Sequence, residues 1–166
     1  MTKKISQFGL LLALAFILGY VERLVPLGFG IPGIKLGLAN LVIVIAIYLF
    51  PLGEVFALDV LKVLLTGFTF GNMASLWYSL GGALLSLLAM LLLKQIGRNT
   101  VVGVSIAGGV FHNLGQLMVA AVMVSTRQVI YYLPVLLIAG LVTGFVLGVV
   151  AWSVLGRLKQ IRGSGR

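Results

Sequence analysis

The residues best suited to chemistry form a polar cluster inside a long apolar stretch. Residues 112–116 read His-Asn-Leu-Gly-Gln. A stripe at helical spacing runs through this segment, made of Ser105, Gly109, His112 and Gln116, with Asn113 at its edge. An imidazole and two carboxamides can orient a polar ligand by directional hydrogen bonds, and a glycine lets the ligand approach closely. The pattern indicates a ligand contact; the alternative is interhelical hydrogen bonding with glycine-mediated packing.

A second polar face lies earlier in the chain. It consists of Asp59, Lys62, Thr66 and Thr69, at positions i, i+3, i+7 and i+10 of one helix. Because charges are costly inside a bilayer, the Asp59–Lys62 pair is expected to face the protein interior. It is either the wall of a substrate or ion path or a neutralised structural ion pair.

The third candidate is the segment 32–40, Pro-Gly-Ile-Lys-Leu-Gly-Leu-Ala-Asn. A proline near the first helical position, a helix N-terminus and Lys35 converge here, and together they favour an anion. The alternative is that Lys35 extends to the lipid headgroups. Glu22 and Arg23 lie near the end of the preceding helix, where exposure at the membrane interface is the expected role.

These residues belong to a chain of unusual composition. Of its 166 residues, 61% are hydrophobic and only 9% are charged, against about 25% charged in typical soluble domains. Since a spanning helix needs roughly 20 apolar residues, the length accommodates about six spans and no separate soluble domain. The composition therefore predicts an all-α integral membrane protein, a single transmembrane domain over 1–166.

Apolar runs bounded by proline, glycine and charge predict six transmembrane helices, near 8–25, 36–50, 55–70, 75–93, 101–124 and 131–155. Eight of the twelve basic residues lie at the chain ends and in one loop, namely Lys3, Lys4, Lys94, Arg98, Arg157, Lys159, Arg162 and Arg166. By the positive-inside rule, this distribution places both termini in the cytoplasm and predicts a multi-pass protein of the bacterial cytoplasmic membrane. It also speaks against nucleic acid as a partner.

The sequence lacks the residues that metal binding and ATP binding by a P-loop require. The chain has no cysteine, a single histidine and three acidic residues, so we expect no metal site and no other cofactor. It also contains no P-loop motif, and ATP-driven work would require a partner.

Small residues mark faces for close helix contact. Ala15-x-x-x-Gly19 occurs in the first helix and Gly140-x-x-x-Gly144-x-x-x-Gly148 in the last. Such a face packs either inside the chain or against a partner subunit.

Three blocks carry a family resemblance: Gly30–Asn40; Gly71 with Ser79-Leu80-Gly81-Gly82; and Ala107–Gln116. They resemble the Gx transporter family, also labelled heptaprenyl diphosphate synthase component I. This family is similar to the substrate-binding S components of energy-coupling factor transporters. The resemblance implies a six-helix bundle with cytoplasmic termini and an outward-facing ligand pocket.

The resulting hypothesis is a membrane transport protein that is not an enzyme and captures a small substrate, anionic or vitamin-like, from the outer face. The expected substrate-binding residues are Lys35, Asn40, His112, Asn113, Gln116, Gly33 and Gly109. The resemblance also implies a coupling membrane subunit with ATPases, docked on the Ala15–Gly19 face.

Two alternatives stay open. One is an accessory membrane subunit of a two-part heptaprenyl diphosphate synthase, and the other is a membrane component of extracellular electron transfer. Catalysis by this chain is disfavoured because diphosphate-binding enzymes hold Mg²⁺ through clustered aspartates, whereas Asp59 is the only aspartate.

Overall fold

The computed structural model describes residues 2–24, 37–97, 100–124 and 127–164, and these are helical almost throughout, with no strand among them. The helices are α1 (Thr2–Leu24), α2 (Leu38–Leu49), α3 (Leu52–Phe70), α4 (Met73–Gln95), α5 (Val101–Val124), the short 3₁₀ helix η1 (Arg127–Tyr132) and α6 (Leu133–Ser164). Helices pair each backbone N–H and C=O internally, which apolar segments require where water is absent. The all-α fold class is confirmed.

Local sequence explains most helix boundaries. α3 begins directly after Pro51, and α4 begins with a capping box in which Asn72 and Ser75 bond each other's backbone. α4 ends before Gly97, whose φ of 73° is left-handed. Helix α5 has the expected bounds. Helices α1 and α6 extend beyond their apolar runs into the polar chain ends, where neither helix contains a proline.

Four helical stretches are long and apolar enough to cross a membrane: Lys4–Leu24, Met73–Gln95, Val101–Val124 and Val129–Gln160. Helix α2 has only 12 residues, or about 18 Å at 1.5 Å per residue. Helix α3 carries three charged residues among its 19. The structure thus supports a membrane protein, while six spans and cytoplasmic termini stay predictions.

Helices α4, α5 and α6 pack closely, with α5 in the middle. A Cβ placed on Gly144 would lie 2.7 Å from the Cα of Ile106, and one on Gly115 would lie 2.5 Å from the carbonyl oxygen of Gly81. The glycine stripe of α6 therefore packs inside the chain, against α5. Helices α1, α2 and α3 form the other part of the bundle.

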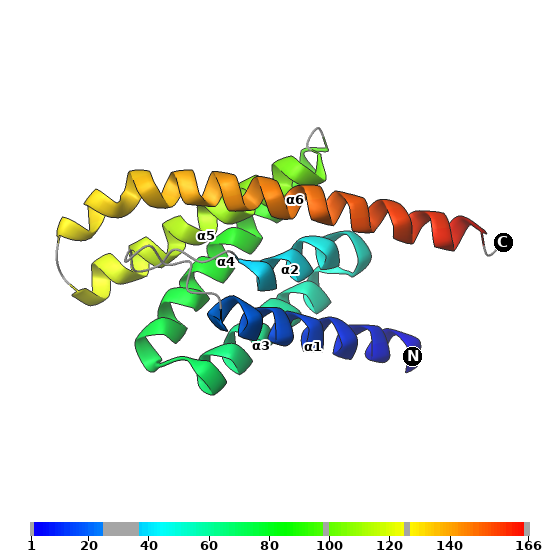
Figure 1. The fold of residues 1–166 in the computed structure, drawn as a ribbon, viewed down its shortest axis with the longest axis horizontal. Coiled ribbons are helices and arrows are strands. Elements are labelled where there is room, and N and C mark those ends of the chain that lie inside the picture. The colour runs from blue at the N-terminus through cyan, green and yellow to red at the C-terminus, as the bar shows by residue number, and fades with distance from the viewer. Residues whose placement is uncertain (1, 25–36, 98–99, 125–126, 165–166) are drawn as a thin grey trace.

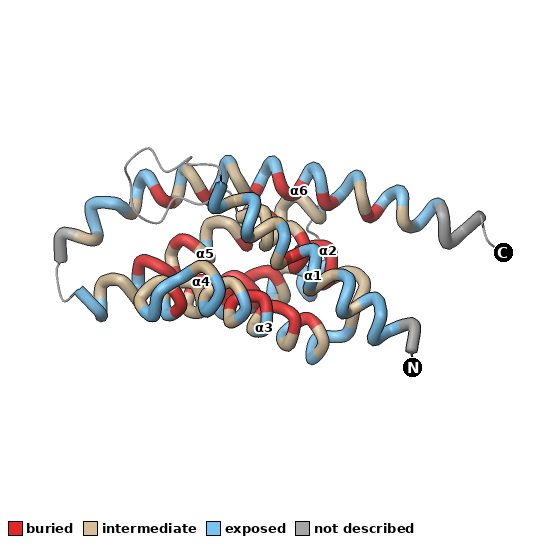
Figure 2. The backbone as a smooth tube through the Cα atoms, turned by 60° about the horizontal axis from the view of Figure 1, so that its bottom comes forward, coloured by how far each residue is buried: buried red, intermediate tan, exposed pale blue. Residues whose placement is uncertain are grey.

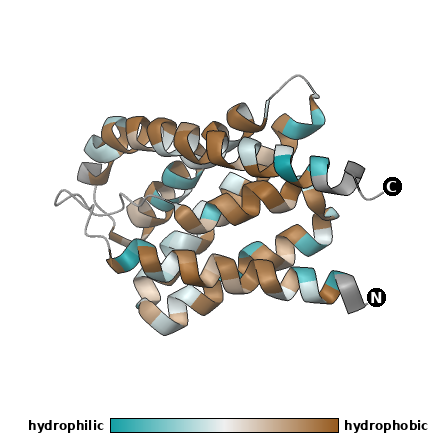
Figure 3. Ribbon diagram, turned by 45° about the vertical axis from the view of Figure 1, so that its right-hand side comes forward, coloured by the Kyte–Doolittle hydropathy of each residue, from teal (hydrophilic) through white to brown (hydrophobic). Residues whose placement is uncertain are grey.

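Both chain ends lie at the same end of the bundle (Figure 1). The start of α1, the α2–α3 connection, the end of α4, the start of α5 and the last turns of α6 lie there, at the terminal end (Figure 1). The α3–α4 turn, the end of α5 and the start of α6 lie at the opposite end, the loop end (Figure 1). Hydrophilic segments gather toward both termini, while most of the remaining helix surface is hydrophobic (Figure 3).

Buried residues form inward-facing stripes, with exposed residues outside them (Figure 2). Helix α2 is the most enclosed, since every residue from Val42 to Ile47 is buried. Many large apolar side chains are exposed, among them Phe68 at 71%, Val122 at 79% and Ile138 at 62%. Such a surface is expected to contact lipid.

Candidate functional site

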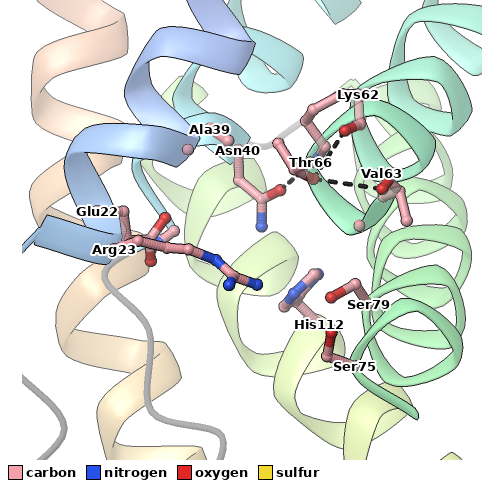
Figure 4. Close-up of a pocket in the computed structure, with 13 residues that line it drawn as sticks. Glu22, Arg23, Ala39, Asn40, Lys62, Val63, Thr66, Ser75, Ser79 and His112 are labelled. Atoms are coloured by element: carbon pink, nitrogen blue, oxygen red, sulfur yellow. Dashed lines mark hydrogen bonds between the residues drawn. The ribbon is translucent and has the colours of Figure 1, made fainter. Parts of the chain in front are cut away.

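A cavity of about 240 Å³ lies among α1 to α5, toward the loop end (Figure 4). Its lining consists of Gly19, Glu22, Arg23, Gly37, Ala39, Asn40, Lys62, Val63, Thr66, Gly67, Ser75, Ser79 and His112. Polar and charged side chains thus converge from five helices in a chain that is otherwise strongly apolar. Because such groups are costly in a bilayer, their convergence suggests a function.

Contacts between α1 and α3 set one wall of the cavity. The rings of Phe16 and Tyr20 each lie 5.1 Å from the ring of Phe70. A Cβ on Gly19 would lie 2.9 Å from Thr66 Cγ2, so the absence of a side chain at Gly19 permits this close approach. This packing positions the end of α1, with Glu22 and Arg23, at the cavity.

The first residue before α2 is held by a carboxylate from α1. Gly37, at φ 72°, donates its backbone N–H to Glu22 Oε1 at 2.6 Å. Because a helix N-terminus carries partial positive charge, a carboxylate is stabilised there. Within the described residues, the Glu22 carboxylate is therefore an anion of the chain itself that lies at this N-terminus.

Lys62 is a buried cation at the cavity wall. Its Nζ donates to Asp59 Oδ1 at 2.6 Å and to Asn40 Oδ1 at 2.8 Å, and both charged side chains are at least 95% buried. Thr66 Oγ1 donates to the Lys62 carbonyl at 2.8 Å. The ion pair and the amide replace the water that the ammonium loses, which keeps the charge tolerable at this depth.

His112 of α5 lines the cavity and is in hydrogen-bond contact with Gln116. Its Nε2 lies 3.0 Å from Gln116 Nε2. This contact holds the imidazole ring against the carboxamide of Gln116, which lies one turn further along α5. Gln116 itself lines a neighbouring, largely apolar cavity of about 270 Å³ bounded by α4, α5, η1 and α6.

Metal ligands do not gather in the part of the chain that the structure describes, where no group of three His, Asp or Glu side chains could hold an ion. The cavity chemistry consists instead of hydrogen-bond donors and charges, presented by an ammonium, a guanidinium, an imidazole, an amide and hydroxyls.

Comparison with known proteins gives one family match. Residues 11–154 match the model of the family described as heptaprenyl diphosphate synthase component I. The chain belongs to this family. It is the family that the 30–40 and 107–116 blocks resemble, and the matched residues include all the described cavity-lining residues. No curated protein and no solved structure matches the chain.

Within this family member, the structure brings several expected residues together. Asn40, Lys62 and His112 line the cavity, as does Gly19. Asp59 and Gln116 lie one hydrogen bond behind it, through Lys62 and His112 respectively. Lys62 and Thr66 of one polar stripe and His112 of the other thus line the same cavity.

Three expected residues also make structural contacts; two of them, Gly109 and Asn113, line a small neighbouring cavity together with Asn40 and His112. Asn113 is buried and donates from Nδ2 to the Leu136 carbonyl of α6 at 2.7 Å. A Cβ on Gly109 would collide with the Gly140 carbonyl, so the backbone that approaches Gly109 closely is that of α6. Ala15 is fully buried in the core.

In this structure Ala15 is buried in the core and the half-buried Gly19 packs against Thr66, while the expected partner contact at this face stays a prediction. Lys35 and Gly33 lie outside the described residues, and their substrate contact stays a prediction. Thr69, expected on the polar face of α3, is exposed rather than part of the cavity wall.

Other cavity residues were not singled out as substrate contacts from the sequence: Glu22, Arg23, Ser75 and Ser79. Glu22 and Arg23 were expected only at the membrane interface. The sequence shows a charged pair at the end of an apolar helix. Whether this pair lines a cavity depends on where α2 and α5 lie in the fold.

Proposed function

We propose that this chain is a membrane transport protein of S-component type, which binds a small polar substrate in the cavity at the loop end. The observation that carries the proposal is the meeting of Lys62, Asn40 and His112 at one cavity in an apolar helical chain. Under the proposed topology the loop end faces outward, so the substrate enters from outside.

The cavity size supports a small substrate. Its volume of about 240 Å³ lies just below the roughly 300–1,000 Å³ typical of pockets for drug-sized ligands. Asn40 and Lys62 are held by mutual hydrogen bonding, and His112 is held by Gln116. Fixed polar groups of this kind bind with little loss of side-chain entropy, which favours recognition.

The proposal includes a division of labour. This chain would capture the substrate without catalysing a reaction, and a coupling membrane subunit with ATPases would drive uptake. Contact of such a subunit at the Ala15–Gly19 face is part of this proposal.

Ligand retention tests the proposal directly. The detergent-purified protein is incubated with a defined mixture of small metabolites, re-isolated, and analysed by native mass spectrometry with identification of the released molecule. We expect one stoichiometric ligand, retained by the Ser153→Ala control, whose exposed side chain lies outside the cavity. His112→Ala should reduce retention by about tenfold, the loss expected for one or two buried hydrogen bonds. An empty wild-type protein would refute the proposal.

The family description favours a second candidate, an accessory membrane subunit of a two-part heptaprenyl diphosphate synthase. In that case the chain should co-purify with a soluble prenyltransferase. Formation of the long-chain product would then require both proteins, and His112→Ala would leave the product yield unchanged.

A further inference from the structure

The charged side chains at the cavity differ in whether they have a partner of opposite charge at contact distance. Lys62 is neutralised by Asp59 at 2.6 Å. Glu22 faces the positive N-terminal end of α2, where Gly37 N–H donates to it. Arg23 also lines the cavity, yet within the described residues the Asp59–Lys62 contact is the only ion pair within 4.0 Å. Arg23 thus brings a positive charge that no described acidic side chain neutralises at contact distance.

The position of Arg23 allows its charge to act on a molecule in the cavity. Its guanidinium extends from α1 across the cavity toward His112, with Ser75 and Ser79 beside His112 (Figure 4). The side chains of His112, Ser75 and Ser79 present hydrogen-bonding groups at this wall. A guanidinium beside such groups suits an anionic oxygen group, with which it forms charge-assisted hydrogen bonds.

We propose that the substrate carries a carboxylate or phosphate group, which Arg23 binds through charge-assisted hydrogen bonds. The rest of the polar ligand contacts His112 and the Asn40–Lys62 wall. This inference rests on the proposed function and specifies the class of its substrate. It also places the anion at Arg23 rather than at the N-terminus of α2, where Glu22 already lies. A cationic group in the position facing His112 would lie beside the Arg23 guanidinium and is disfavoured there.

The test uses a metabolite mixture with equal numbers of acids, neutral compounds and amines of similar size. Wild-type protein, Arg23→Gln, Arg23→Lys and Arg157→Gln are each incubated with the mixture in lipid-free detergent and again with added anionic phospholipid. Retained molecules are identified by mass spectrometry. Arg157 is a matched control, because it is an exposed arginine near the terminal end of α6.

We expect wild-type protein and Arg157→Gln to retain an acid, and Arg23→Gln to bind it about tenfold or more weakly, as expected for the loss of one charge-assisted contact. Arg23→Lys should recover part of the affinity, since it keeps the charge but loses the bidentate geometry. Added phospholipid should leave the acid bound.

Three results would overturn the inference. Retention of an amine or a neutral compound would refute the anionic class while leaving the proposed transport function intact. Displacement of the acid by phospholipid, in an Arg23-dependent manner, would identify Arg23 as a headgroup contact. A protein that retains nothing would refute the proposed function together with the inference.

Discussion

At the residue scale, the buried charge of Lys62 depends on its hydrogen-bond and ion-pair partners. Its ammonium is buried beside Asp59 and Asn40, so removal of the aspartate charge leaves a cation without compensation. We predict that Asp59→Leu lowers the free energy of unfolding by about 3–5 kcal/mol, the usual cost of breaking a buried pair. Chemical denaturation in detergent micelles measures this change.

The double variant Asp59→Leu with Lys62→Met provides the control for that prediction. It removes both charges and should recover most of the lost stability, because an apolar pair of similar volume is often as stable as the ion pair. If the single and double variants are equally unstable, packing rather than charge is the cause.

Residue spacing predicted part of this site and missed the rest. The i, i+3 spacing placed Asp59 and Lys62 on one face, and their pairing follows from that spacing alone. The place of Arg23 in the cavity lining was not predicted, because it depends on α1 packing against α3 and lying across the cavity from His112 of α5, which no local pattern encodes. Asn113 directly follows His112, but the 100° turn between successive helical residues directs it to α6 instead.

At the scale of elements, α5 depends on glycines for its contact with α6. A side chain at Gly144 would meet the backbone of Ile106 and Ser105, which cannot move aside easily. We predict that Gly144→Ala destabilises the protein by about 1–3 kcal/mol through overpacking. Thermal unfolding in detergent measures the difference.

Gly156 offers a matched control on the same helix, because nothing lies within 4 Å of a Cβ placed there. Gly156→Ala should be neutral or stabilising by up to about 1 kcal/mol, since alanine favours the helix over glycine. Equal destabilisation by both substitutions would contradict close packing at Gly144.

Helix α2 should depend on the carboxylate of Glu22. Since Glu22 Oε1 accepts the Gly37 N–H beside the positive helix end, Glu22→Ala removes an acceptor and a favourable charge. We predict faster hydrogen exchange in the first turn of α2, with a local cost of about 1–2 kcal/mol. Glu22→Gln keeps an acceptor and should show an intermediate effect. Unchanged exchange in Glu22→Ala would show that this contact does not stabilise the helix.

The positions of the helices in the sequence were easier to predict than the helices against which each one packs. Apolar runs located the six α-helices but not the short helix η1, and the bounds of α5 agree because polar residues and glycine flank its run. The runs do not reveal that Gly109 faces α6 or that Ala15 packs in the core. Those contacts depend on helix order in space, which periodicity leaves undetermined.

For the whole molecule, the arrangement of helix ends links fold and function. The start of α1, the end of α4 and the last turns of α6 lie at one end of the bundle, and the cavity lies toward the other. If basic residues mark the cytoplasmic side, the cavity opens outward, as capture of an external substrate requires. Membrane orientation is therefore a test that the proposed function must pass.

The chain contains no cysteine, so single-cysteine variants can report this orientation without any background changes. Gln95→Cys and Gln160→Cys place exposed thiols at the terminal end, and Met73→Cys places one at the loop end. We predict that a membrane-impermeant maleimide added to intact cells labels Met73→Cys alone, because the positive-inside rule holds the basic end in the cytoplasm. Permeabilised cells should label all three variants, which controls for accessibility. Labelling of Gln95→Cys or Gln160→Cys from outside would reverse the orientation, direct the cavity inward, and exclude uptake by the proposed route.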